Sequence, residues 1–211
     1  MVTAEIIWGL PIYRRRDVPS SENTPSPGEP MEKQRIKVKV CLAGEPMVGK
    51  TSLIRRYVLD EYDDRYIATL GAKVTKKELT SHDPARGEFA VTLILWDIWG
   101  NKNVRELLKD AYYHGAHGII AVCDVTRPET MTELDGWAQA ITSVAGDIPV
   151  CLLANKNDMA DHPLKEPEIR KFSKERSWPT FLTSAKTGEH VEDAFDEIVR
   201  KILNPDAAPK G

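Results

Sequence analysis

The stretch Gly44-Glu45-Pro46-Met47-Val48-Gly49-Lys50-Thr51 fits the pattern G-x-x-x-x-G-K-[ST], which is typical of a loop that binds phosphate. An apolar run from Ile36 to Ala43 precedes this loop, and a helical pattern from Thr51 to Leu59 follows it. The order predicts a strand, a loop and a helix in succession, which is the context that the motif requires. The simpler interpretation is a glycine-rich turn that only caps a helix.

Each part of the loop has a physical role in holding a phosphate chain. Gly44 and Gly49 supply a permissive backbone. The N–H groups of residues 47–51 can turn inward, and the helix that follows adds the positive end of its dipole. Lys50 would bridge the outer phosphates, and the hydroxyl of Thr51 would hold Mg²⁺. The loop residues predicted to bind nucleotide are Gly44, Met47, Val48, Gly49, Lys50, Thr51 and Ser52.

A second motif indicates which base is bound. Asn155-Lys156-Asn157-Asp158 directly follows an apolar run, Val150 to Ala154. The carboxylate of Asp158 can accept hydrogen bonds from the ring N–H and the exocyclic amine of guanine, a donor pair that adenine lacks. Asn155 would tie this segment to the phosphate-binding loop, the stem of Lys156 can lie over the purine, and Ser184-Ala185-Lys186 could offer a backbone N–H to the guanine carbonyl. Alone, the tetrapeptide is also a common surface turn.

Three residues between these motifs could sense a third phosphate. Thr69 is placed to give Mg²⁺ a second hydroxyl, Asp97 follows an apolar strand where its carboxylate can bind a metal-bound water, and Gly100 can present its N–H to the γ-phosphate. The predicted metal site therefore consists of Thr51, Thr69 and Asp97. The alternatives are a threonine at the start of a strand and a carboxylate that caps the next helix.

In this order the motifs resemble those of the Ras superfamily of small GTPases, and most closely its Rab branch. The stretches Trp96-Asp97, residues 112–120 and Asp124-Val125-Thr126 carry the Rab-like resemblance, and the match spans residues 34–203. The resemblance implies an α/β fold of the P-loop NTPase class, that is, a Ras-like G domain that hydrolyses GTP to GDP and phosphate. It implies Lys50, Thr69, Gly100 and Asn101 as catalytic residues, Tyr62 against the guanine, and effector, exchange-factor and GTPase-activating proteins as partners.

The chain departs from the family pattern at residues that bear on catalysis. Asn101 stands where the family has a glutamine that orients the attacking water, and Trp99 and Pro46 replace small residues. We therefore expect GTP binding with slow hydrolysis, and a catalytically feeble GTP-binding scaffold is the alternative. An ATP-dependent kinase or ATPase is disfavoured by Asp158.

Composition agrees with one domain in a reducing compartment. The 211 residues suit a single α/β domain. The net charge of −3 does not indicate a basic surface that would bind nucleic acid. The cysteines, Cys41, Cys123 and Cys151, lie in apolar runs and read as buried residues with no metal spacing. We expect a cytoplasmic protein.

Apolar strands alternate with helical patterns along residues 34–203. The pattern predicts a mainly parallel six-stranded sheet with helices on both faces and one antiparallel hairpin strand. Predicted strands cover residues 36–43, 72–79, 90–96, 118–124, 149–154 and 180–183, and predicted helices cover 51–59, 102–113, 130–144, 167–175 and 191–203. The hairpin connection, residues 81–87, is expected to be a long protruding tip.

Both ends of the chain differ from this domain. Residues 1–33 contain a Ser-, Pro- and Gly-rich stretch and are predicted to be a disordered extension, in which residues 6–16 could touch an acidic membrane surface or a partner. The blander alternative is a non-essential extension. Residues 204–211 are predicted to be a flexible tail without a cysteine for prenylation, and Val2 does not allow N-myristoylation. We expect no lipid anchor.

Overall fold

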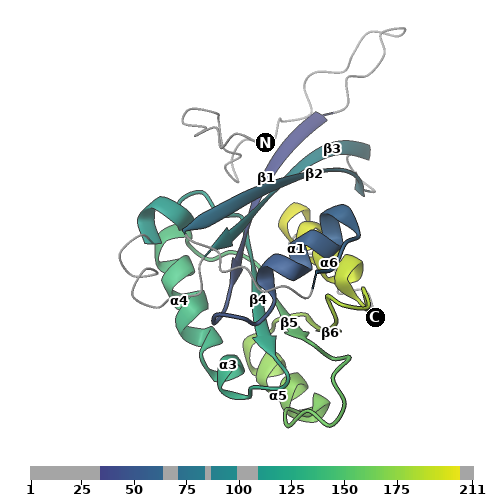
Figure 1. The fold of residues 1–211 in the computed structure, drawn as a ribbon. Helices are drawn as coiled ribbons and strands as arrows, with labels where there is room; N and C mark the ends of the chain where they lie inside the picture. Colours follow the sequence, from purple (N-terminus) through teal and green to yellow (C-terminus); the bar gives the residue numbers. More distant parts are fainter. Residues whose placement is uncertain (1–33, 64–70, 84–86, 99–108, 205–211) are drawn as a thin grey trace, which may run out of the picture.

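One mixed sheet organises the chain in a computed structural model, which describes residues 34–63, 71–83, 87–98 and 109–204. The strand order is β2-β3-β1-β4-β5-β6 (Figure 1). β2 and β3 are antiparallel, and the other neighbouring pairs are parallel. The predicted mainly parallel six-stranded sheet is therefore confirmed. The strands are β1 (Gln34–Ala43), β2 (Ala72–Asp83), β3 (Gly87–Ile98), β4 (Gly118–Asp124), β5 (Val150–Asn155) and β6 (Thr180–Thr183).

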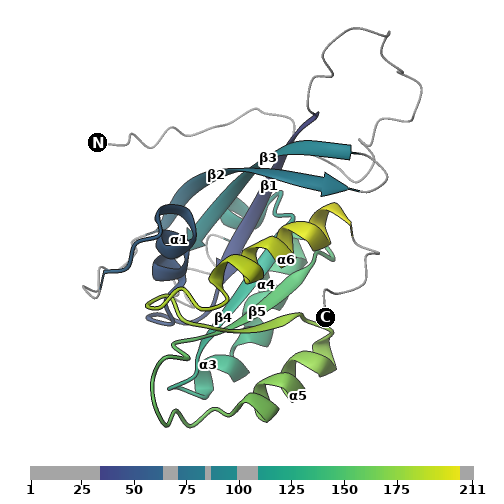
Figure 2. The ribbon, with the colours of Figure 1, turned by 90° about the vertical axis from the view of Figure 1, so that its right-hand side faces the viewer.

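Helices cover both faces of the sheet, as predicted (Figures 1 and 2). On one face lie α1 (Lys50–Leu59) and α6 (Val191–Leu203), whose Tyr57 and Phe195 rings stack with centroids 4.1 Å apart. On the other face lie α3 (Glu129–Thr132), α4 (Leu134–Ala145) and α5 (Glu166–Arg176). β4 and β5 are buried along their whole length because both of their faces are covered.

The parallel strands bring the predicted motifs to one edge of the sheet. β1 ends at the phosphate-binding loop, β3 carries Asp97 near its end, β5 ends at Asn155, and β6 ends just before Ser184. Parallel strands place their carboxyl ends at the same edge, which is where open α/β sheets bind ligands.

The boundaries of most elements agree with the pattern to within two residues, but the hairpin does not. β2 and β3 remain paired out to Asp83 and Gly87, so the predicted tip at residues 81–87 is wrong in extent. Only residues 84–86 separate the two strands. Backbone hydrogen bonds between strands need no apolar side chains, so the ladder continues past the end of the apolar pattern.

The predicted helix at residues 130–144 is divided into α3 and α4 at Glu133. Glu133 keeps helical dihedrals, with φ −76° and ψ −12°, so the two helices follow nearly one path. Of the predicted helix at residues 102–113, the described part, residues 109–113, is helical.

Several predictions fall on residues outside the described ranges. These are the extension at residues 1–33, most of the tail, Thr69, Trp99, Gly100 and Asn101. Within the described ranges, none of the helices has the length and apolar character needed to cross a membrane. The three cysteines, Cys41, Cys123 and Cys151, are buried, as expected from the sequence.

Candidate functional site

The loop between β1 and α1 depends on two glycines. Gly44 has a φ of 139° and Gly49 a φ of 99°, values that disfavour any residue with a Cβ. A Cβ would lie 2.2 Å from the carbonyl oxygen of Val122 at Gly44, and 2.2 Å from Nδ2 of Asn155 at Gly49. Only glycine therefore lets the loop pass this close to the ends of β4 and β5.

Lys50 is buried beneath this loop at the first position of α1. Its Nζ donates to the carbonyl oxygens of Gly44 at 2.7 Å and Glu45 at 2.9 Å, so the ammonium lies across the loop. Burial lowers the pKa of Lys50 to about 8, although the negative charges of Asp97 and Glu45 oppose this shift. An anion held in the loop would favour the charged ammonium, which is the interaction expected of a phosphate-binding lysine.

Thr51 and Asp97 form the described part of the predicted metal site. The Thr51 hydroxyl donates to Oδ2 of Asp97 at 2.5 Å, and the Asp97 carboxylate is buried near the end of β3. The described residues contain no group of three or more His, Cys, Asp or Glu arranged to hold a metal ion. The donor set fits Mg²⁺, because Mg²⁺ is usually held by one or two protein oxygens together with phosphate and water.

Asn155 connects the two predicted halves of the site. Its Nδ2 donates to the carbonyl oxygen of Val48 in the phosphate-binding loop at 2.9 Å. Its Oδ1 accepts the N–H of Ala185 at 3.1 Å and the hydroxyl of Thr183 at 3.4 Å. The Ala185 N–H is thus already engaged, and a guanine carbonyl would have to share it. A single buried side chain fixes three segments that are far apart in sequence.

The side chains predicted to bind guanine have their own supports. Lys156, with a φ of 68°, donates from Nζ to Oδ2 of Asp124 at 2.6 Å. Ser184 donates from its hydroxyl to Oδ1 of Asp158 at 2.6 Å, and the N–H of Thr187 donates to the same hydroxyl oxygen at 3.1 Å. Burial acts to raise the pKa of Asp124, but hydrogen bonds from Lys156 and Thr126 outweigh burial and lower it. Asp124 therefore stays ionised beside Lys156.

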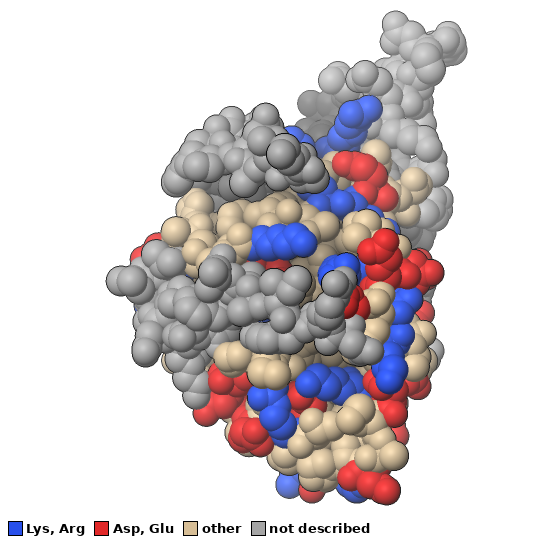
Figure 3. All heavy atoms as spheres, viewed as in Figure 1, with Lys and Arg blue, Asp and Glu red and all other residues tan. Residues whose placement is uncertain are grey.

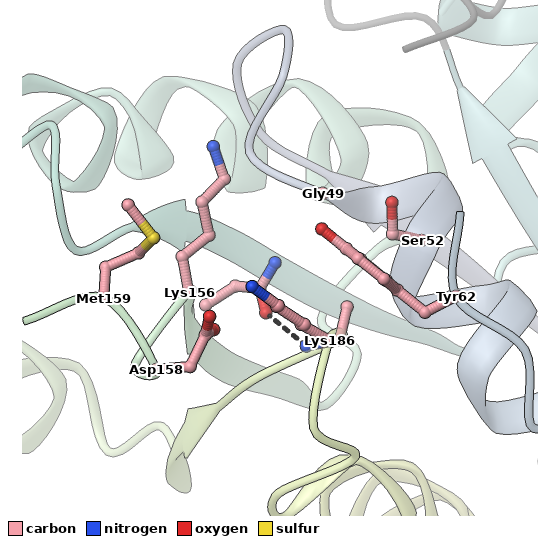
Figure 4. A pocket seen from close by; sticks show the side chains of 9 residues that line it. Gly49, Ser52, Tyr62, Lys156, Asp158, Met159 and Lys186 are labelled. Atoms are coloured by element: carbon pink, nitrogen blue, oxygen red, sulfur yellow. Dashed lines mark hydrogen bonds between the residues drawn. The ribbon is translucent and has the colours of Figure 1, made fainter. Parts of the chain in front are cut away.

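A pocket opens between the two loops. Its lining is Gly49, Ser52, Tyr62, Asn155, Lys156, Asp158, Met159, Ala185 and Lys186. Figure 4 shows Tyr62 reaching across from the α1 side toward the side of the pocket that carries Lys156 and Asp158. All of these residues except Met159 were predicted from the sequence. Met159 is exposed beside Asp158 and carries no sequence signal for binding.

The structure adds supporting residues that the sequence analysis missed. Arg56 of α1 donates from Nε to the carbonyl oxygen of Ala185 at 2.9 Å and from Nη2 to that of Lys186 at 2.7 Å. Asp124 was noted only for its resemblance to the Rab pattern, yet it holds Lys156. The position of Asp124 at the carboxyl end of a buried strand is the signal that could have identified it.

Comparisons with known proteins identify the family of the chain. The family model described as Ras family matches residues 39–204. The chain is 34% identical to Ras-related protein Rab-18 of Lymnaea stagnalis over 177 residues, which are 82% of this chain and 85% of that protein. It is 34% identical to Rab-18-B of Danio rerio over 168 residues, 79% of each chain. It is 29% identical to Rab-7b of Mus musculus over 175 residues, 81% of this chain and 85% of that protein.

Proposed function

The chain belongs to the Ras superfamily of small GTPases, in its Rab branch, and from this premise we propose that it is a switch that binds GTP and GDP with Mg²⁺ and hydrolyses GTP slowly. The observation that carries the proposal is the hydrogen bond from Asn155 to Val48. This bond joins a loop suited to phosphates to a pocket that presents Asp158, so one ligand with a phosphate chain and a guanine would satisfy both.

Guanine selection would rest on Asp158. Its carboxylate pairs with the ring N–H and exocyclic amine of guanine, whereas adenine would leave it without donors. Ser184 orients the carboxylate from one side, and Arg56 holds the backbone of the neighbouring loop. This arrangement argues against an ATP-dependent enzyme that shares only the phosphate-binding loop.

The reaction would be GTP + H₂O to GDP and phosphate, by in-line attack of water on the γ-phosphate. Lys50 would neutralise charge that develops on the phosphate oxygens, and Thr51, Thr69 and Asp97 would hold the metal site. Bound Mg²⁺ would supply Lewis-acid stabilisation of those oxygens. Gly100 would present its N–H to the γ-phosphate.

Slow turnover is expected from Asn101. Its amide stands on a stem one methylene shorter than that of glutamine, and a water displaced by about 1 Å can slow a reaction by about 100-fold. No arginine of the matched motifs supplies a cation to the γ-phosphate in this mechanism, so we expect a GTPase-activating partner. Effectors and an exchange factor are the other partners expected of a switch in signalling or trafficking.

Nucleic acid is not among the proposed partners. On the face shown in Figure 3, the described Lys and Arg side chains are interspersed with Asp and Glu. A nucleic-acid interface would gather positive charge in one stripe or patch.

A GTP-binding scaffold with negligible turnover is the second candidate, and Pro46 favours it. Proline has no N–H, so this loop has one donor fewer for the phosphates than a loop with another residue at this position. Such a protein would retain one nucleotide while its surface binds partners.

Single-turnover hydrolysis of preloaded GTP at saturating Mg²⁺ separates the two candidates. We would compare the native chain with Asn101→Gln and Lys50→Ala, and measure GDP and ADP affinity in parallel. Native turnover that rises with Asn101→Gln and disappears with Lys50→Ala supports the cycling GTPase. GTP that stays intact in both the native and Asn101→Gln proteins supports the scaffold. Tighter binding of ADP than of GDP would refute both.

A further inference from the structure

The outer turn of the phosphate-binding loop, residues 45–47, is held from behind by the segment that follows β4. Nη2 of Arg127 donates to the carbonyl oxygen of Pro46 at 2.9 Å. Nε1 of the buried Trp137 in α4 donates to Oε1 of Glu45 at 2.9 Å. The bond from Arg127 fixes the orientation of a backbone peptide, whereas the bond from Trp137 holds only the side chain of Glu45.

Arg127 is itself firmly placed. Its Nε donates to Oδ2 of the buried Asp124 at 3.1 Å, and its N–H donates to the carbonyl oxygen of Asp124 at 2.9 Å. Its own carbonyl oxygen accepts the hydroxyl of Thr130 at 2.7 Å. The guanidinium therefore projects from a tight turn between β4 and α3. Oδ2 of Asp124 also accepts a hydrogen bond from Nζ of Lys156, so Arg127 and Lys156 share one carboxylate oxygen. Arg127 therefore also connects the guanine-binding side to the loop.

The Pro46–Met47 peptide, whose carbonyl Arg127 binds, has an alternative orientation of lower steric cost. Met47 has a φ of 64°, and a proline followed by such a residue is the pattern of a type II turn, where glycine or asparagine is preferred at the second position. A non-glycine residue pays a steric cost in this region. Rotating the Pro46–Met47 peptide by half a turn would give a type I turn, in which Met47 has a negative φ and the cost is removed.

That rotation would also damage the phosphate site. The C=O and N–H of a trans peptide point in opposite directions. Because Arg127 binds the Pro46 carbonyl, the Met47 N–H of the same peptide points away from Arg127. After the rotation, a carbonyl oxygen would face the phosphates in place of a donor. Asn155 orients another peptide of the loop in the same way, through the Val48 carbonyl.

We propose that Arg127 is a positioning residue that binds the Pro46 carbonyl and thereby keeps the Met47 N–H turned toward the phosphates of the nucleotide. The inference rests on the proposed function, because it needs a nucleotide in the loop. It matters in this chain because Pro46 has no N–H of its own and Met47 strains the turn. Glycine at position 47 would make the support of Arg127 largely unnecessary.

The test combines Arg127→Met with Met47→Gly and measures GDP affinity by equilibrium titration in the presence of Mg²⁺. Methionine keeps much of the arginine stem and loses its donors. If the inward orientation becomes a minority state, affinity falls in proportion to its population, so we expect Arg127→Met to weaken GDP binding about tenfold in the native background. In the Met47→Gly background, we expect the same substitution to weaken binding less than about threefold.

Two controls separate positioning from a general loss of structure. Arg170→Met removes an exposed arginine of α5 that pairs with Glu166 away from the site, and it should leave GDP affinity unchanged. The ratio of GDP affinity to IDP affinity, which reports on Asp158 and the amine of guanine, should stay within about twofold in Arg127→Met, since Asp158 is oriented by Ser184 and not through Asp124. If Arg127→Met does not fold, Arg127→Lys keeps the positive charge beside Asp124 and should show a smaller loss with the same dependence on Met47.

The GDP affinities of these variants either support or overturn the positioning role of Arg127. Equal GDP affinity in native and Arg127→Met proteins would overturn the inference, as would the same fold-loss in both backgrounds or a changed preference for GDP over IDP. Failure of the native chain to bind GDP would instead refute the proposed function. A loss that depends on Met47 and spares the base preference supports positioning by Arg127.

Discussion

Replacing Gly49 with alanine tests whether the close approach of two loops is what requires glycine. The new Cβ would lie 2.2 Å from Nδ2 of Asn155, on a backbone with a φ of 99°. The positive φ costs alanine about 1–2 kcal/mol. Asn155 must move, which would break its buried hydrogen bond to Val48 and add about 1–3 kcal/mol. The free energy of unfolding should therefore fall by about 2–5 kcal/mol.

Gly188→Ala is the matched control for this experiment. Gly188 has a φ of 88°, and its added Cβ would meet only Cδ of Arg56 at 3.7 Å, an ordinary contact. The free energy of unfolding of Gly188→Ala should fall only by the cost of a positive φ for alanine, about 1–2 kcal/mol. For a domain of this size, 1 kcal/mol corresponds to about 2–4 °C in Tm.

Thermal unfolding followed by circular dichroism provides the measurement. Scans at two GDP concentrations would separate changes in folding from changes in binding, because only the binding contribution depends on ligand concentration. We expect the Tm of Gly49→Ala to fall clearly below that of Gly188→Ala. If the two variants lose the same amount, the clash with Asn155 is not what requires glycine at position 49, and the reasoning fails.

Three further predictions concern charged residues of the site. Lys50→Met should stabilise the nucleotide-free protein by up to about 3 kcal/mol near pH 7. The reason is that burial lowers the pKa of Lys50 from 10.5 to about 8, and below pH 8 Lys50 carries its proton in both the folded and the unfolded chain. Between pH 8 and 10.5 Lys50 is protonated in the unfolded chain but not in the folded one, so its contribution to stability rises with pH. Urea titrations at about pH 7.5 and about pH 10 should therefore show the free energies of unfolding of the native and Lys50→Met proteins converging. A constant difference between them would contradict this prediction. Asp158→Asn should weaken GDP binding by about 10–100-fold and IDP binding less, measured by competition; an equal loss for both would count against base readout by this carboxylate. Arg56→Met should speed GDP dissociation by about tenfold in a stopped-flow chase, since the backbone of Ala185 and Lys186 loses its donors, while an unchanged rate would show that the loop needs no such support.

The places of the glycine-rich loop and of the Asn155–Asp158 motif in the fold could be predicted because each is a short, contiguous stretch of sequence. The loop requires glycine where the backbone is crowded and a lysine and hydroxyl at its end, and all of these fall within residues 44–51. Asp158 follows Asn155 at a fixed spacing on one turn. The alternation of apolar runs also predicted the sheet, because strands covered on both faces need uninterrupted apolar residues.

The supports of these motifs could not be predicted in this way. Arg127 contacts Pro46 across 81 positions of sequence, Trp137 contacts Glu45 across 92, and Arg56 contacts Ala185 across 129. An arginine on a helix or after a strand is by itself more typical of an exposed charge than of a brace for a loop. The extension of β2 and β3 to Asp83 and Gly87 was missed for a related reason, since backbone pairing leaves no mark on the side-chain pattern.

The sequence by itself determined the kind of fold, the order of the motifs and the chemistry available to them, because these depend on residue type and local spacing. Only the tertiary structure decided which distant side chains hold the backbone of those motifs in place. The direction of a peptide such as Pro46–Met47 depends on what packs behind it, and that neighbour is brought there by the sheet and its helices.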